Sequence, residues 1–508
     1  MATTNTAAPR THPRLAVQAF WLTFSKFISA ILNILMPVVL VRILSQHDFG
    51  VYKQVFLFVG TTSSFAAFSV GVSALYYMPR QPKRGGQIAL NIFVYNVIAG
   101  LFPLLLLLFY PQFLNLIFRS GDLEPFALLL GIFVMLQLNA SLVEIIPTAL
   151  QDIRNSTLFV TGTQLFKIAA VLVVALIFRT VRSIVLACIA TAALYIVILV
   201  RYLYNRFGPF WTHFDRKFFL EQLAYAAPLG AYGIVWVFRK DLDNYFVGAM
   251  YSPAQYAIYA IGWMEVPLIQ LFIESMLAVM VVRISALHQE GRTEDIRNVL
   301  ASAINRLATV QFPIYAILLV AGHDLIVFFY TKTYAASARI FYITITLIVL
   351  NVFMYDPIVR AYMELRKFIL LVRIGVLIAL AMVLGPVIHH FGMIGAALTA
   401  VLGDLGERLI VGRKVCQTIE ATWHDVRLLS GVLRVAVVAA VAALIALGTR
   451  NALASQPLIL RLALTGISFG AVYVAGVFLW HLPGYEVVTK DRLLSVVQSA
   501  RARLTGAT

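Results

Sequence analysis

A group of aromatic and charged residues between positions 225 and 243 has the types and the spacing that suit a phosphorylated sugar. Five of them fall on or beside one face of a helix: Tyr232, Trp236, Arg239, Lys240 and Asp243. Aromatic rings offer apolar faces to sugar rings, and arginine makes bidentate contacts with phosphate. The alternative is an interfacial aromatic belt followed by charges that end the helix, which explains Tyr232 poorly. Both interpretations stay open at this point.

Other ionisable residues lie within apolar runs, where a charge is costly unless it faces a polar cavity. Lys26 borders a polar stripe on the first run, and it either attracts an anion into a cavity or bonds backbone carbonyls between helices. Lys167 and Arg373 are further cations of this kind. A carboxylate at such depth could also take up a coupling proton or Na⁺, and the candidates are Asp241, Asp243, Glu265 and Asp404.

The chain lacks the motifs of common enzymes. Its nine histidines form no HExxH zinc motif, and no Walker loop is present, so ATP is not the direct energy source. His389 and His390 lie at the end of an apolar run and suit an ordinary interfacial pair. We expect no enzyme, no cofactor and no metal site.

Composition places these residues in a membrane. Of 508 residues, 61% are hydrophobic and 12% are charged, against about 45–50% and about 25% in soluble proteins. So few charges do not cover that much apolar surface in water. The net charge of +17 raises the question of nucleic-acid binding, but the Lys and Arg residues lie in short loops between apolar runs. We therefore expect an all-α polytopic membrane protein that binds no nucleic acid.

The number of spans and their orientation follow from the apolar runs and the loops between them. A transmembrane helix needs about 20 apolar residues. Fourteen runs meet this requirement, near 15–41, 54–77, 88–110, 126–147, 157–178, 183–204, 222–249, 256–282, 304–330, 338–358, 368–389, 394–412, 430–448 and 458–480. With alternating sides, 25 Lys and Arg residues lie on the side of the N-terminus and 11 on the other side. The excess of positive charge predicts that both termini are cytoplasmic.

An internal repeat divides the chain. Ser45–Tyr52 and Ser252–Tyr259 align without a gap at an offset of 207 residues. Each segment begins with Ser, continues with three variable positions and ends with an aromatic, a small and a β-branched residue followed by Tyr. The first and seventh runs begin at the same offset, so two six-helix lobes with pseudo-symmetry and an appended helix pair are expected. The predicted parts are a cytoplasmic tail at 1–14, a first lobe at 15–204, a linker at 205–221, a second lobe at 222–412, a linker at 413–429, a helix pair at 430–480 and a cytoplasmic tail at 481–508.

The segment Leu40–Tyr52, which follows a long first run, resembles the "LARLLGPEDFGxY"-like motif of bacterial polysaccharide flippases of the Wzx/PST type. These belong to the multidrug/oligosaccharidyl-lipid/polysaccharide (MOP) exporter superfamily. Pro228, Gln255–Tyr259 and Phe391–Ala397 are similar to later parts of that family, so that the resemblance covers roughly residues 15–415. Ser-Gln-His stands where Gly-Pro-Glu is common, and Ala257 replaces a glycine, which leaves the subfamily open.

The resemblance implies translocation of an undecaprenyl-diphosphate-linked oligosaccharide across a bacterial cytoplasmic (inner) membrane, during O-antigen, capsule or exopolysaccharide synthesis. It implies diphosphate or cavity contacts from Lys26, Lys53, Lys167, Arg239, Lys240 and Arg373. Tyr232 and Trp236 would contact the glycan. A polysaccharide polymerase and a chain-length regulator would be partners. Two alternatives remain within the superfamily: a cation-coupled multidrug exporter, which predicts an acidic cavity, and a lipid II flippase, which predicts a more arginine-rich first span.

Overall fold

The structure is a computed structural model that describes residues 27, 31–212, 214–264 and 266–482. Every regular element in these ranges is a helix. The chain divides into two compact units, Met1–Ala260 (unit 1) and Ile261–Thr508 (unit 2). The expectation of an all-α chain is confirmed for the residues described.

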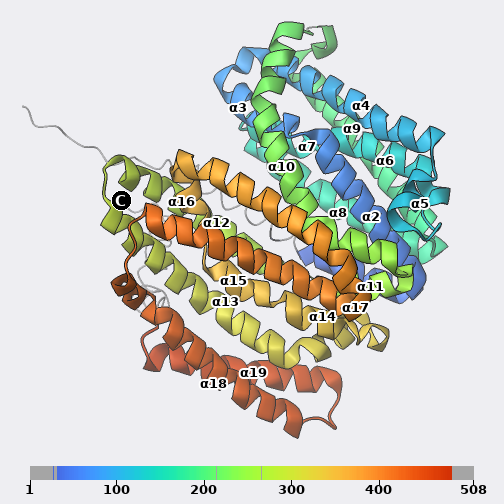
Figure 1. Ribbon diagram of the computed structural model, residues 1–508. Helices are drawn as coiled ribbons and strands as arrows, with labels where there is room; N and C mark the ends of the chain where they lie inside the picture. Colours follow the sequence, from blue (N-terminus) through green and yellow to red (C-terminus); the bar gives the residue numbers. More distant parts are fainter. Residues whose placement is uncertain (1–26, 28–30, 213, 265, 483–508) are drawn as a thin grey trace, which may run out of the picture. The chain divides into compact units, whose positions relative to one another are not determined.

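Unit 1 is built from ten helices and a helix at Ile31–Ile43 that precedes them. These are α2 (Gln46–Ala67), α3 (Ser73–Arg80), α4 (Gly85–Phe109), α5 (Phe113–Phe118), α6 (Ala127–Ala140), α7 (Leu142–Ala149), α8 (Ile153–Phe178), α9 (Val181–Phe207), α10 (Arg216–Met250) and most of α11 (Pro253–Gly262). Short 3₁₀ turns lie at Val70–Val72, Pro82–Arg84, Glu124–Phe126 and Phe210–Thr212. Helices α4 and α9 both pack against α6, because all three are apolar on most of their surface (Figure 1).

Unit 2 holds the remaining helices. These are α12 (Pro267–Gln289), α13 (Thr293–Tyr330), α14 (Ser337–Thr344), α15 (Thr346–Val352), α16 (Asp356–Ala361), α17 (Met363–Thr418), α18 (Ser430–Ala452) and α19 (Leu458–Leu479), with 3₁₀ turns at Lys332–Tyr334 and Trp423–Leu429. Helix α17 contains a kink at Gly392, whose φ of 64° favours glycine. Helices α18 and α19 lie side by side and pack against α13 (Figure 1).

Among the described residues, nine helices are long and apolar enough to cross a membrane, or ten if the bent pair α2 and α3 counts as one span. Several expected runs differ from single straight helices. The run near 54–77 bends by 56° where Phe68 and Ser69 adopt left-handed backbone angles. The run near 256–282 is divided between α11 and α12, the run near 338–358 is divided among α14, α15 and the start of α16, and the runs near 368–389 and 394–412 share α17. The chain is a multi-pass membrane protein, and fourteen spans with cytoplasmic termini stay a prediction.

Helix α10 lies in unit 1, although the repeat predicts that it begins the second lobe. Two hydrogen bonds attach it to α2: the Gln54 amide donates to the Gly248 carbonyl oxygen at 3.2 Å, and the Thr61 hydroxyl donates to the Asp241 carboxylate at 2.8 Å. Unit 1 therefore extends to Ala260, beyond position 204 where the first predicted lobe ends. The predicted lobe limits remain a hypothesis about the repeat.

The two copies of the repeated motif have the same local structure. Ser45 precedes α2 and its hydroxyl accepts from the Asp48 backbone N–H at 3.0 Å. Ser252 precedes α11 and accepts in the same way from Gln255 at 3.4 Å. The two helix starts also meet each other, because Gly50 has no side chain and packs directly on the Pro253 backbone. The repeat therefore forms a close helix–helix contact inside unit 1.

Candidate functional site

One side of α10 carries the aromatic and cationic residues that the sequence singled out. Tyr232 and Trp236 are 42% and 46% exposed. The Lys240 ammonium lies 5.6 Å from the centre of the Trp236 ring, within the range of a cation–π contact. Arg239 is half-buried beside them. Positions 232, 236 and 240 are four residues apart, so helical spacing alone brings an exposed aromatic pair and a cation into one row.

Asp243 continues this row but is buried. Its side chain is only 2% exposed, and Tyr259 of α11 lies directly against it. The Tyr259 hydroxyl donates to the Asp243 carboxylate at 2.5 Å, and the Asn244 amide is 3.5 Å from the same oxygen. Tyr256 donates to Asn244 at 3.3 Å. Asp243 is thus a buried carboxylate held by neutral hydrogen-bond donors.

The other predicted residues of unit 1 lie on different helices. Lys53 is half-buried on α2, with its ammonium 5.6 Å from the centre of the Phe49 ring. Lys167 is half-buried on α8 and interacts electrostatically with Glu144 on α7. Thr163, one turn before Lys167, donates to Glu144 at 3.1 Å. Lys167 therefore has a carboxylate close by.

In unit 2, two predicted residues take part in separate ion pairs. The buried Arg373 donates to Glu407 at 2.9 Å, and Tyr355 donates to the same carboxylate oxygen at 2.9 Å. Asp404 accepts from Arg408, one turn later on α17, at 2.6 Å. The opposite charges lie directly against one another in both pairs, so each ionised group is compensated locally.

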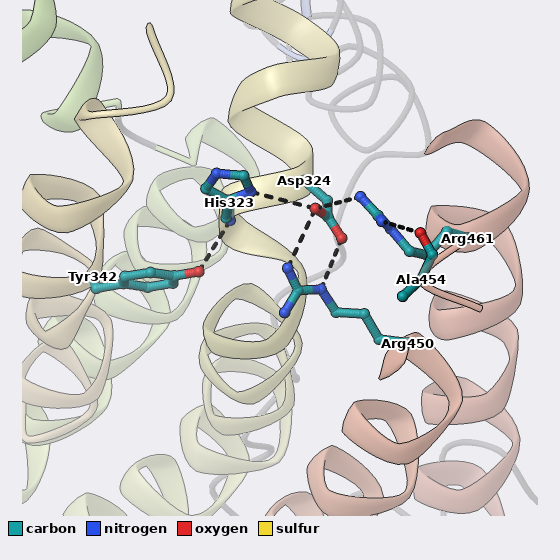
Figure 2. A network of polar contacts seen from close by, with 6 residues as sticks. All are labelled: His323, Asp324, Tyr342, Arg450, Ala454 and Arg461. Atoms are coloured by element: carbon teal, nitrogen blue, oxygen red, sulfur yellow. Dashed lines mark hydrogen bonds and ion pairs between the residues drawn. The ribbon is translucent and has the colours of Figure 1, made fainter. Parts of the chain in front are cut away.

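A further ionic cluster in unit 2 was not anticipated from the sequence. Asp324 on α13 is 2% exposed and lies between two arginines of the α18–α19 pair (Figure 2). Arg450 donates to it at 2.7 Å and 3.3 Å, and Arg461 donates at 2.8 Å. Arg461 also donates to the Ala454 carbonyl oxygen at 3.3 Å. The cluster fixes the C-terminal helix pair to α13. A single aspartate inside an apolar run is the signal that could have identified it.

The structure thus brings together only part of the predicted site. Trp236, Arg239, Lys240, Asp241 and Asp243 share α10, whereas Arg373 and Asp404 belong to unit 2. Lys26 and Glu265 lie outside the described residues. The partners Thr61 and Tyr259 were missed, because each lies on a different helix from its aspartate and helical spacing does not relate the two. Within the described ranges, no group of three or more His, Cys, Asp or Glu residues could hold a metal ion.

Comparison with known proteins gives a family and a fold. A family model described as polysaccharide biosynthesis protein matches residues 39–339. No curated protein matches the sequence significantly. A structure of the lipid II flippase MurJ in an inward closed conformation has a TM-score of 0.68 at 14% identity, and the alignment covers 92% of this chain and 100% of that one. An inward-facing multidrug resistance MATE transporter of the MOP superfamily has a TM-score of 0.59 at 13% identity, with 77% and 95% covered. At these identities the likeness concerns the fold alone.

Proposed function

Because the chain belongs to the polysaccharide biosynthesis protein family and shares its fold with a lipid II flippase and a multidrug transporter of the MOP superfamily, we propose that it translocates an undecaprenyl-diphosphate-linked oligosaccharide by alternating access. The direction is from the inner to the outer leaflet of a bacterial cytoplasmic membrane. The chain then acts as a carrier, not an enzyme, and its product passes to a surface-polysaccharide polymerase and chain-length regulator. Two compact units suit a mechanism in which one bundle rocks against another.

The row on α10 is the observation that carries the proposal for this substrate. Tyr232 and Trp236 are both partly exposed and offer aromatic surface to a sugar, and Lys240 adds a positive charge against the Trp236 ring. A lipid-linked glycan presents sugar rings and a diphosphate to its carrier, so it needs both kinds of contact. An apolar drug would use the rings but not the cation.

Export of surface polysaccharide by cells that depend on this chain tests the role of the row. We expect Trp236→Ala and Lys240→Gln each to lower export about tenfold at normal membrane abundance, which corresponds to about 1.4 kcal/mol of lost substrate contact. The matched control is Lys217→Gln, an exposed lysine at the start of the same helix, which should stay within about twofold of wild type. Wild-type export from both row variants would contradict the assignment.

Asp243 is the carboxylate best suited to carry a coupling proton. It is buried next to neutral donors, Tyr259 and Asn244, whereas Asp404 accepts from Arg408. A proton that binds to a buried carboxylate with no cation beside it removes the cost of the buried charge. In an ion-paired carboxylate the cation already compensates that charge. Transport by Asp243→Asn should lose its dependence on a proton gradient, and Asp404→Asn should keep it. Equal proton dependence in both variants would remove Asp243 from the cycle. Na⁺ coupling predicts a response to a Na⁺ gradient instead.

The two alternative functions differ from this one in substrate, and competition between ligands separates them. The three probes are an undecaprenyl-diphosphate-linked oligosaccharide, lipid II and a lipophilic organic cation. We expect the oligosaccharide lipid to bind at least tenfold more tightly than the other two. Preference for lipid II or for the organic cation would establish the corresponding alternative.

A further inference from the structure

A cavity of about 1150 Å³ lies in unit 1, apart from the row on α10. It lies where the end of α3, the turn between α7 and α8 and the end of α9 meet. These segments adjoin three loops that the Lys and Arg distribution predicts to be cytoplasmic. The cavity therefore lies at one end of the helices, at the level expected for the lipid headgroups of the inner leaflet.

Three cations and one carboxylate line this cavity. The cations are Lys83, Arg201 and Arg206. The carboxylate, Asp152, accepts hydrogen bonds from the Asn155 amide at 2.9 Å and the Tyr202 hydroxyl at 3.0 Å, and Arg206 lies 3.8 Å away. Burial by itself raises the pKa of Asp152, but these hydrogen bonds and the charge of Arg206 outweigh it and lower the pKa. Asp152 is thus ionised and already engaged by its neighbours.

Lys83 and Arg201 provide the charge that remains. Both are exposed, and neither makes an ion pair with any residue in the part of the chain that the structure describes. The lining as a whole has two more positive than negative charges. Asn205 and Gln151 add amide groups that can donate hydrogen bonds. Such a lining suits phosphate oxygens, which accept several hydrogen bonds and carry the opposite charge.

One wall of the cavity is apolar and continues onto the outer surface of the helices. Phe159 on α8 and Val197 and Ile198 on α9 form this wall. Val197 is 64% exposed, and the neighbouring Leu158 is 61% exposed, as expected of side chains that face acyl chains. The cavity therefore joins a cationic end to a lipid-facing surface, whereas a site for a soluble anion needs only the cationic end.

We propose that this cavity binds the phosphate headgroup of an anionic phospholipid, with Lys83 and Arg201 holding the phosphate and the apolar wall of α8 and α9 holding the upper acyl chain. Basic pockets between helices on the cytoplasmic side are typical sites for anionic lipids. The volume is sufficient for a phosphate, a glycerol and the first methylene groups, since about 300–1,000 Å³ accommodates most small ligands. The residues that line this cavity lie outside α10, so the site is separate from the row proposed for the transported substrate.

Titration of the purified full-length chain with short-chain phosphatidylglycerol tests the proposal, with the thermal unfolding midpoint as the readout. Lys83→Gln combined with Arg201→Gln should weaken binding at least tenfold. Lys83→Arg combined with Arg201→Lys should restore it to within about threefold. The matched control is Arg154→Gln, an exposed cation of the same α7–α8 region that does not line the cavity, and it should bind within twofold of wild type. All variants change exposed residues, and their unfolding midpoints without lipid verify that they fold.

Two further ligands identify the source of the phosphate. Phosphatidylcholine has the same glycerol and chains but no net charge, and inorganic pyrophosphate has the charge but no chains. We expect both to bind at least tenfold more weakly than phosphatidylglycerol. Equal binding of phosphatidylcholine would show that the cations play no role, and tighter binding of pyrophosphate would show a site for soluble anions. Either result, or unchanged binding by the double glutamine variant, would overturn the proposal.

Discussion

Replacement of Gly50 by alanine should break the contact between the two copies of the repeated motif. A Cβ atom at position 50 would lie 3.0 Å from Pro253 Cα and would overlap the Pro253 carbonyl carbon and oxygen. Backbone atoms do not move aside as a flexible side chain does, so α2 and α11 must separate by more than an ångström. Overpacking in a rigid site costs about 1–3 kcal/mol, and more in some cases.

Gly60 provides the matched control for this substitution. It lies on the same helix, and a Cβ there would meet nothing within 4 Å. Gly→Ala inside a helix raises the free energy of unfolding by about 0.5–1 kcal/mol when the new methyl group meets no clash. The two variants should therefore differ by about 2–4 kcal/mol, with Gly50→Ala the less stable.

Thermal unfolding in detergent, followed by tryptophan fluorescence, measures this difference. A change of 1 kcal/mol shifts the midpoint by about 2–4 °C in a unit of about this size. We expect Gly50→Ala to unfold roughly 4–16 °C below Gly60→Ala. Equal midpoints for the two variants would refute the close contact at Pro253 and, with it, the packing of the two motif copies.

Three further substitutions probe polar groups outside the row on α10. Asp324→Asn removes the charge that two arginines share and should lower the free energy of unfolding by about 1–3 kcal/mol. We expect a lower thermal unfolding midpoint and faster proteolysis between 453 and 457, and wild-type values of both would contradict the cluster. Gln311 is buried and both polar atoms of its amide lack a partner among the described residues, so Gln311→Leu should stabilise unit 2 by about 1–2 kcal/mol; a lower midpoint would contradict this. The lowered pKa of Asp152 means that its carboxylate stabilises the fold above the unfolded value of about 3.9 and loses this effect as the pH falls through the folded pKa. Asp152→Asn should therefore be less stable than wild type near pH 7, and the difference should shrink as the pH falls below about 3.9. A difference that grows toward low pH would show the opposite sign.

Apolar runs predicted the straight helices well, because length and hydrophobicity alone decide whether a segment can span a bilayer. The runs near 88–110 and 157–178 correspond to α4 and α8. The breaks were not predicted from the runs, and the one at Phe68 lies at a contact between segments that are distant in the sequence. Gly230 on α10, for example, leaves room for the Phe68 carbonyl oxygen, which would be 2.6 Å from a Cβ at that position. No local signal in residues 54–77 indicates that contact.

The row on α10 was predicted because its members are one turn apart, and one turn is a local property. Spacing also placed Asp243 on the same face, but spacing does not reveal burial. Helix α11 covers Asp243 and supplies Tyr259, while Thr61 reaches Asp241 from another helix. Whether a charged residue is exposed or paired depends on which helix lies opposite, and that is a property of the tertiary structure.

The central claim is that this chain moves a lipid-linked anionic oligosaccharide across a bilayer. Purified protein in proteoliposomes, loaded with a labelled undecaprenyl-diphosphate oligosaccharide, allows the amount that reaches the opposite leaflet to be measured with a membrane-impermeant quencher. We predict rapid exchange between leaflets with wild-type protein and exchange at least tenfold slower with Trp236→Ala combined with Lys240→Gln. Exchange no faster than in protein-free liposomes would contradict the account.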